Sequence, residues 1–180
     1  MSEVQEEIIH VRTADGASAV WRVEYSLSVD ECGDVDGCQL SVIDPLGERY
    51  EATGRDLYEC LKDIRRITDQ AGILLCCNGA RKNAMPWGSL RRGGAYFVDT
   101  HRRWRAVLPW DQVETFGYAP PRKIASVAEQ DAYMDVFRKP MPVWGLLNPV
   151  LWVTFGFNEL YWSTFFGLRR LRWFVSGLKR

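Results

Sequence analysis

The first fifty residues carry the pattern that most constrains this fold, because short alternating or β-branched runs are separated by glycine turns. Within the run Ala19–Val29, apolar and polar residues alternate over the nine positions from Trp21 to Val29. The predicted strands cover residues 8–13, 19–29, 39–43 and 48–52, and the turns lie at 15–16, 33–37 and 44–47. This pattern predicts an N-terminal antiparallel β meander.

A helix is predicted at Arg55–Gln70, where apolar residues recur every three or four positions. Thr53 followed by Asp56 resembles a capping box at its start, and Gly72 stands where a C-terminal cap belongs. The apolar run Ile73–Cys77 then predicts a strand, so strand, helix and strand follow one another over 48–77. In open α/β sheets, sites tend to lie just beyond such a strand end.

A second helix is predicted at Val127–Phe137, with Ser126 and Glu129 as its capping box. From residue 139 onward the composition becomes aromatic and basic, and Glu159 is the only acidic residue there. We therefore predict an α+β fold with a compact domain at 1–138 and a helical, aromatic-rich basic tail at 139–180. The predicted order is β meander, central strand-helix-strand unit, closing helix and tail.

Charge is distributed unevenly along a chain whose formal net charge is zero. Residues 1–60 hold 4 basic and 14 acidic groups, whereas 61–140 hold 14 and 8, and 141–180 hold 5 and 1. This asymmetry predicts either an acidic surface for a basic partner or neutralisation between the two halves of the fold. The start, MSEVQEEIIH, has no signal-peptide pattern, which predicts a cytoplasmic protein.

The five cysteines predict free thiols rather than a disulfide framework or a zinc site. Their number is odd, no CxxC spacing occurs, and only two histidines are present. A nucleophilic Cys77 near Arg81 is an alternative, but thiols in apolar strands usually belong to the core. We expect no metal, no cofactor and no catalytic residue.

The segment 78–92 interrupts an apolar run with a basic, glycine-punctuated sequence that predicts a loop displayed between two strands. It has no acidic residue, so it suits an acidic or phosphorylated partner or else forms internal ion pairs. Its aromatic neighbours also fit a nucleic-acid surface, which the acidic first third disfavours. The partner-binding candidates are Asn78, Arg81, Lys82, Arg91 and Arg92.

The tail combines tryptophans with basic groups, a composition typical of segments at membrane interfaces. Residues 141–158 carry no charge but contain prolines and asparagines that suit a straight spanning helix poorly. Packing on the domain, a homodimer contact and peripheral association with the inner membrane all remain open. The candidate residues for these contacts are Trp144, Trp152, Trp162, Trp173, Arg169, Arg170 and Arg172.

The strings CNGARKN at 77–83, AYFVDT at 95–100 and VETFGYA at 113–119 resemble a family of small bacterial cytosolic proteins. The spaced Pro, Gly and Arg of MPWGSLRRGG and the helix at 126–137 resemble that family as well, so the similarity covers about residues 55–138. The resemblance implies a compact α+β domain. Members of the family resemble immunity proteins encoded near polymorphic toxins, which implies binding rather than catalysis.

Three functions follow from these patterns. The first is a non-enzymatic protein that binds and neutralises a toxin or effector through the acidic first third or the basic segment. The second is a protein held at a membrane surface by its tail. The third is an enzyme that uses the loop at 78–92.

Overall fold

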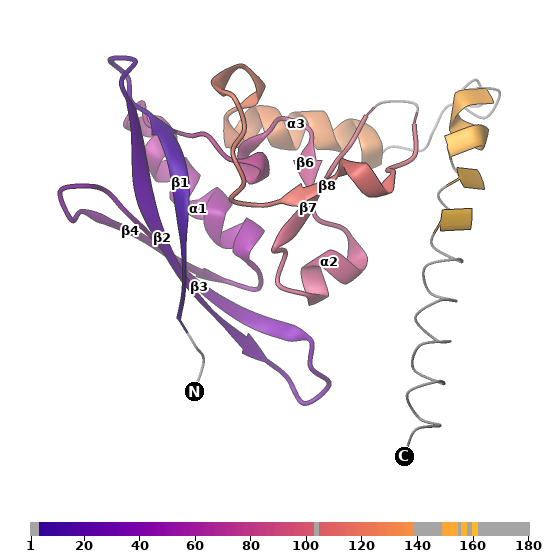
Figure 1. Cartoon of the computed structure of the whole chain (residues 1–180), viewed down its shortest axis with the longest axis horizontal. Helices are drawn as coiled ribbons and strands as arrows, with labels where there is room; N and C mark the ends of the chain where they lie inside the picture. The colour runs from indigo at the N-terminus through magenta and orange to yellow at the C-terminus, as the bar shows by residue number, and fades with distance from the viewer. Residues whose placement is uncertain (1–3, 103–104, 139–148, 155, 158–159, 162–180) are drawn as a thin grey trace, which may run out of the picture.

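A curled antiparallel sheet forms one layer of the computed structural model, and helices cover one of its faces (Figure 1). The structure describes residues 4–102, 105–138, 149–154, 156–157 and 160–161. The strands of this sheet are β1 (Gln5–Arg12), β2 (Ser18–Val29), β3 (Val35–Ile43), β4 (Arg49–Gly54) and β5 (Leu74–Leu75). Their order is β4-β3-β2-β1-β5, and every neighbouring pair is antiparallel. The predicted mixture of helices and antiparallel strands is confirmed.

The helix α1 (Leu57–Gln70) crosses the inner face of this sheet, from the edge at β4 to the edge at β5. Alternate strand residues such as Ile9, Val23 and Leu40 are fully buried against Leu61 and its neighbours on α1. The other set of alternate residues faces outward, as expected when only one face of a sheet is covered. The main hydrophobic core therefore lies between the sheet and α1.

Asp56, and not Thr53, caps α1. The Asp56 side chain accepts a hydrogen bond from the backbone N–H of Glu59, whereas Thr53 pairs with Gln39 inside the sheet. The predicted capping box at Thr53 is therefore wrong, because β4 extends to Gly54 and delays the helix start. Gly72 has a φ of +72° just after the helix, a conformation that glycine adopts at low strain.

A second, smaller sheet lies beyond α1 and has the order β6-β7-β8. Its strands are β6 (Ala84–Met85), β7 (Phe97–Thr100) and β8 (Gln112–Glu114). Short helical elements connect the strands: η1 (Asn78–Ala80), α2 (Gly88–Arg92), η2 (Pro109–Asp111) and η3 (Pro121–Lys123). The helix α3 (Val127–Arg138) follows and carries the predicted capping box, since Ser126 and Glu129 exchange hydrogen bonds.

Two predictions for the centre of the chain are corrected. The strand predicted at 73–77 is present but shorter, as β5, and it pairs antiparallel with β1, so the rule for sites in open α/β sheets does not apply to its end. The segment 78–92 is not a displayed loop either, since it forms η1, β6 and α2. Hydrogen bonds to residues distant in the chain, described below, provide the physical reason.

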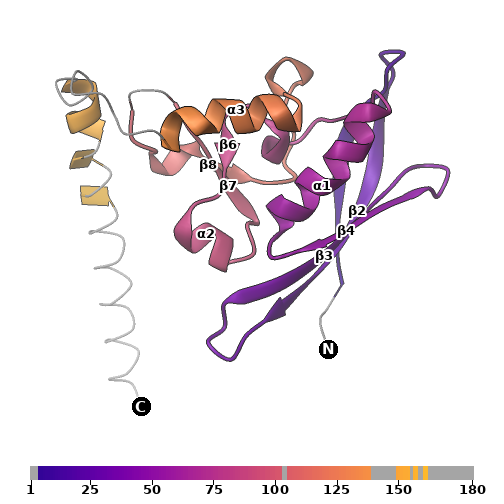
Figure 2. The ribbon, with the colours of Figure 1, turned by 180° about the vertical axis from the view of Figure 1, so that it is seen from behind.

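Residues 149–154, 156–157 and 160–161 are helical and lie at the opposite end of the molecule from the five-stranded sheet (Figures 1 and 2). Their contact with the domain runs through the segment 105–111. The backbone N–H of Ala106 donates to Thr154 Oγ1 over 3.2 Å, and the rings of Trp110 and Phe157 lie 5.6 Å apart.

Candidate functional site

The Asn-Gly turn of the basic segment is fastened to the end of β8. The backbone N–H of Asn78 donates to Gly117 O over 2.8 Å, and its side-chain amide donates to Glu114 O over 3.0 Å. Gly79 N donates to Thr115 O over 2.8 Å, and Gly79 and Ala80 are both buried. The start of the predicted loop is therefore an internal support between two sheets.

A buried Arg65–Gln130 pair holds the same segment from the side of the helices. Gln130 of α3 accepts a hydrogen bond from Arg65 Nη1 of α1 over 2.7 Å, and both side chains are fully buried. The Gln130 amide nitrogen lies 2.8–3.0 Å from the carbonyl oxygens of Gly79, Arg81 and Ala84. This network joins α1, α3 and the basic segment, and neither side chain belongs to a recognisable sequence motif.

Arg91 forms internal ion pairs, one of the two roles expected for the basic segment. Its Nη1 lies 2.8 Å from Asp56 Oδ2 and 3.2 Å from Glu59 Oε1, and its guanidinium lies over the ring of Tyr58. Because Asp56 also caps α1, Arg91 of α2 ties the start of α1 to the small sheet. Its position is explained by the fold.

The other basic candidates occupy different surroundings. Arg81 is half-buried, its Nη1 lies 3.5 Å from Asn78 Oδ1, and burial lowers the pKa of its guanidinium, as does the charge of Arg102. Lys82 is exposed beside the ring of Tyr133, and Arg92 is exposed on α2. The structure thus brings Asn78 and Arg81 together and places Arg91 against the N-terminus of α1.

Of the tail candidates, only Trp152 is among the described residues, and 59% of its surface is exposed. The remaining candidates lie outside the described residues: Trp144, Trp162, Trp173, Arg169, Arg170 and Arg172.

Cys77, the candidate nucleophile, is fully buried, and burial raises the pKa of its thiol to about 11. Burial raises the pKa of Cys76 as well. A protonated thiol without solvent access is a poor nucleophile. Both residues fit the core role predicted for them.

We expect a thiol reagent such as DTNB to label one of the five cysteines rapidly in the folded protein, because Cys32 alone is exposed. The Cys32→Ser variant should lose this rapid labelling, whereas Cys77→Ser should keep it. Denaturation should expose all five thiols. Rapid modification of Cys77 in the folded chain would restore the case for a nucleophile.

An acidic cluster in the small sheet was not found by sequence reasoning. Asp111 is 3% exposed, and its two carboxylate oxygens lie 2.6 and 2.7 Å from Arg105 Nη2. Burial raises the pKa of Asp99 on β7 to about 6, and the Asp111 charge adds to this shift. His101 is 6% exposed, and its ring lies 5.7 Å from the ring of Trp87. β-pairing brings these residues together, so local sequence carries no signal for the cluster.

We expect Asp99→Asn to raise the free energy of unfolding by about 1–2 kcal/mol near pH 7.5, after allowance for partial exposure. The pKa of Asp99 lies at about 6 in the folded protein against an ordinary value of 3.8. Protonated Asp99 therefore contributes its full stability to the wild type below pH 3.8, and this contribution is lost as the pH rises through about 6. Urea unfolding at several pH values should show the gain vanish at about pH 3.5, and a pH-independent gain would contradict it.

Four acidic residues of the first third lie together at the free end of the β2–β3 hairpin. Between Val23 and Glu48 the chain has seven acidic residues and no lysine or arginine. The exposed acidic residues at this hairpin end are Asp30, Glu31, Asp34 and Asp36. The β1–β2 turn lies at the other end of the sheet (Figure 1). The hairpin end is therefore a negatively charged projection.

Two carboxylates of this hairpin end stabilise the turn itself. Asp30 Oδ1 accepts from the backbone N–H groups of Cys32 and Asp34 over 2.8 and 2.9 Å, and Asp36 Oδ1 accepts from Ser28 Oγ over 2.8 Å. Glu31 and Asp34 are exposed residues of the same tip. They are the residues best suited to charge reversal without loss of the turn.

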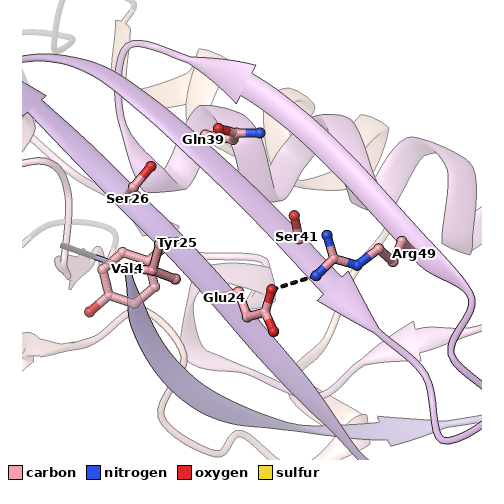
Figure 3. Close-up of a pocket in the computed structure, with 7 residues that line it drawn as sticks. All are labelled: Val4, Glu24, Tyr25, Ser26, Gln39, Ser41 and Arg49. Carbon is pink, nitrogen blue, oxygen red and sulfur yellow. Dashed lines mark hydrogen bonds and ion pairs between the residues drawn. The ribbon is translucent and has the colours of Figure 1, made fainter. Parts of the chain in front are cut away.

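The outer face of the five-stranded sheet carries a small polar hollow of about 180 Å³ (Figure 3). It is lined by Val4, Glu24, Tyr25, Ser26, Gln39, Ser41 and Arg49. Glu24 and Arg49 form an ion pair across β2 and β4 over 2.5 Å. These opposite charges compensate each other, so the hollow does not favour an anion or a cation.

Among the residues that the structure describes, His, Cys, Asp and Glu do not form a group of three or more that would hold a metal ion. Within the same ranges, none of the helices combines the length and the apolar character needed to cross a membrane. No protein-family model matches the chain, and no curated protein matches it.

Proposed function

We propose that this chain is a non-enzymatic bacterial protein of the immunity type that binds and neutralises a basic toxin or effector. Its contact surface in this proposal is the acidic end of the β2–β3 hairpin. The observation that carries the proposal is the concentration of exposed carboxylates there, with no basic residue between Val23 and Glu48. Complementary charge of this kind accelerates encounter and selects partners.

The acidic hairpin suits this role better than the basic segment. Asn78 and Arg91 support the fold through Glu114, Asp56 and Glu59. A partner that recruited these groups would have to replace internal contacts. Glu31 and Asp34 project from an exposed turn, so a partner reaches them without rearranging the domain.

In the proposed arrangement, residues 1–138 act as the binding domain and 139–180 as an appended helical tail. The resemblance of 77–83, 95–100 and 113–119 to immunity-type proteins adds support for binding rather than catalysis. The proposed site of action is the cytoplasm, where an incoming or co-produced toxin would be captured, with the basic, aromatic composition of the tail suited to the inner-membrane surface.

The test is co-expression with each toxin candidate that the genes neighbouring this chain encode. The full chain should restore growth and should bind the purified, catalytically inactivated toxin in calorimetry, with an affinity that falls as salt rises. The double variant Glu31→Lys/Asp34→Lys should bind about tenfold or more weakly. Failure of the wild-type chain both to bind and to rescue growth would overturn the function.

A matched control separates the hairpin from net charge. Glu6→Lys/Glu114→Lys changes the net charge by the same amount at exposed positions outside the hairpin end. It should retain most of the affinity. Equal losses in both double variants would show that the acidic hairpin is not the contact surface.

A further inference from the structure

Large apolar side chains of the C-terminal helical residues are exposed to solvent. The exposed fractions are 54% for Val150, 71% for Val153, 45% for Phe157 and 68% for Leu160. Spacings of three and four residues place side chains on one side of a helix. We call this set the apolar stripe.

The side of these helical residues that borders the stripe at Val150 and Phe157 faces the domain. Thr154 accepts from the backbone N–H of Ala106, and Leu151 is half-buried. Phe157, at the border of the stripe, contacts Trp110, which is itself 64% exposed. Figures 1 and 2 show the segment at the outer end of the molecule, beyond α3 and the small sheet. The apolar stripe therefore continues into an exposed aromatic surface at that end.

The chain that adjoins the stripe is basic. The 19 residues after Tyr161 include five lysines or arginines and no acidic residue, together with five Trp or Phe residues. A second copy of the chain would bring two such basic segments together, which opposes self-association. An anionic phospholipid surface suits both the aromatic and the basic side chains, because aromatic rings lie at the level of the headgroups and cations bind lipid phosphates.

We propose that the apolar stripe, with Trp110 and Trp152, docks this protein on an anionic phospholipid membrane surface. The helical residues lie along the surface, because their Thr154 side remains attached to the domain. The acidic end of the β2–β3 hairpin is a different surface, which lies below α2 in the view of Figure 1. This inference does not depend on the proposed toxin binding.

Vesicle flotation of the full chain tests the inference. The protein should float with phosphatidylcholine vesicles that contain phosphatidylglycerol and should stay behind with phosphatidylcholine alone, and added salt should weaken flotation. Val153→Glu/Leu160→Glu should reduce the bound fraction at least tenfold. Ile8→Glu/Val20→Glu is the control, because these apolar residues are also exposed but lie on the sheet.

The outcomes distinguish a membrane surface from a second copy of the chain as the partner of the stripe. Circular dichroism verifies that both double variants are folded. Flotation that the stripe variant leaves unchanged would overturn the proposal, as would equal binding to neutral vesicles. A dimer in sedimentation that only the stripe variant abolishes, without flotation, would assign the stripe to a second copy. The Glu31→Lys/Asp34→Lys variant should float as the wild type does. Failure of toxin binding and failure of membrane binding can therefore be told apart.

Discussion

Gln130→Leu is expected to lower the free energy of unfolding by about 3–4 kcal/mol, the largest effect of a single substitution proposed for this chain. Gln130 is fully buried, and its side-chain oxygen accepts from Arg65 over 2.7 Å. Leucine would leave the Arg65 cation without that acceptor inside the protein. It would also remove the donor that the carbonyls of Gly79, Arg81 and Ala84 share.

Urea unfolding followed by circular dichroism measures this loss. Gln70→Leu is the matched control, because Gln70 is exposed at the end of α1 and should change stability by less than about 0.5 kcal/mol. A loss below about 1 kcal/mol for Gln130→Leu would mean that water or rearranged side chains satisfy Arg65. The network would then not be the support of the basic segment.

Gly79→Ala is expected to lower stability by about 2 kcal/mol, because no space exists for a methyl group there. A Cβ at this position would lie 2.7 Å from Leu61 Cδ2 and 2.9 Å from Thr115 Cγ2. Gly79 therefore lets η1 pass between α1 and the end of β8. The glycine of the CNGAR string is required by close packing, since its φ is not positive.

Gly93→Ala is the control for this effect. A Cβ at Gly93 would meet only backbone oxygens at 3.6 Å, an ordinary contact distance. Its stability should change by less than about 0.5 kcal/mol. Equal stability of the two alanine variants would show that Leu61 and Thr115 yield to the new methyl group.

Local patterns predicted the elements whose stability depends on near neighbours. The helix predicted at 55–70 and the observed α1 share their last residue, and the Ser126–Glu129 capping box occurs where expected. Strand alternation in the first fifty residues likewise corresponds to the antiparallel sheet. Periodicity and capping depend on residues a few positions apart, so they can be recognised in the sequence alone.

The candidate site was predicted less well, because its contacts join residues far apart in the chain. The sequence left open whether Arg91 meets a partner or forms an internal ion pair, and the structure pairs it with Asp56, which lies 35 residues earlier. The Arg65–Gln130 contact spans 65 positions. The Asp99–Asp111 cluster depends on the pairing of β7 with β8. Such pairs leave no periodic signal in one sequence.

By itself the sequence determined the mixed fold class, the antiparallel first third, the positions of α1 and α3, and the separation of acidic from basic composition. Only the tertiary structure decided which charges are used internally and which remain exposed. The reason is geometric: backbone periodicity acts over a few residues, whereas ion pairing and burial depend on contacts between segments that are distant in the sequence. Those contacts turned the start of the basic 78–92 segment into an internal support and left the acidic hairpin and the apolar stripe exposed.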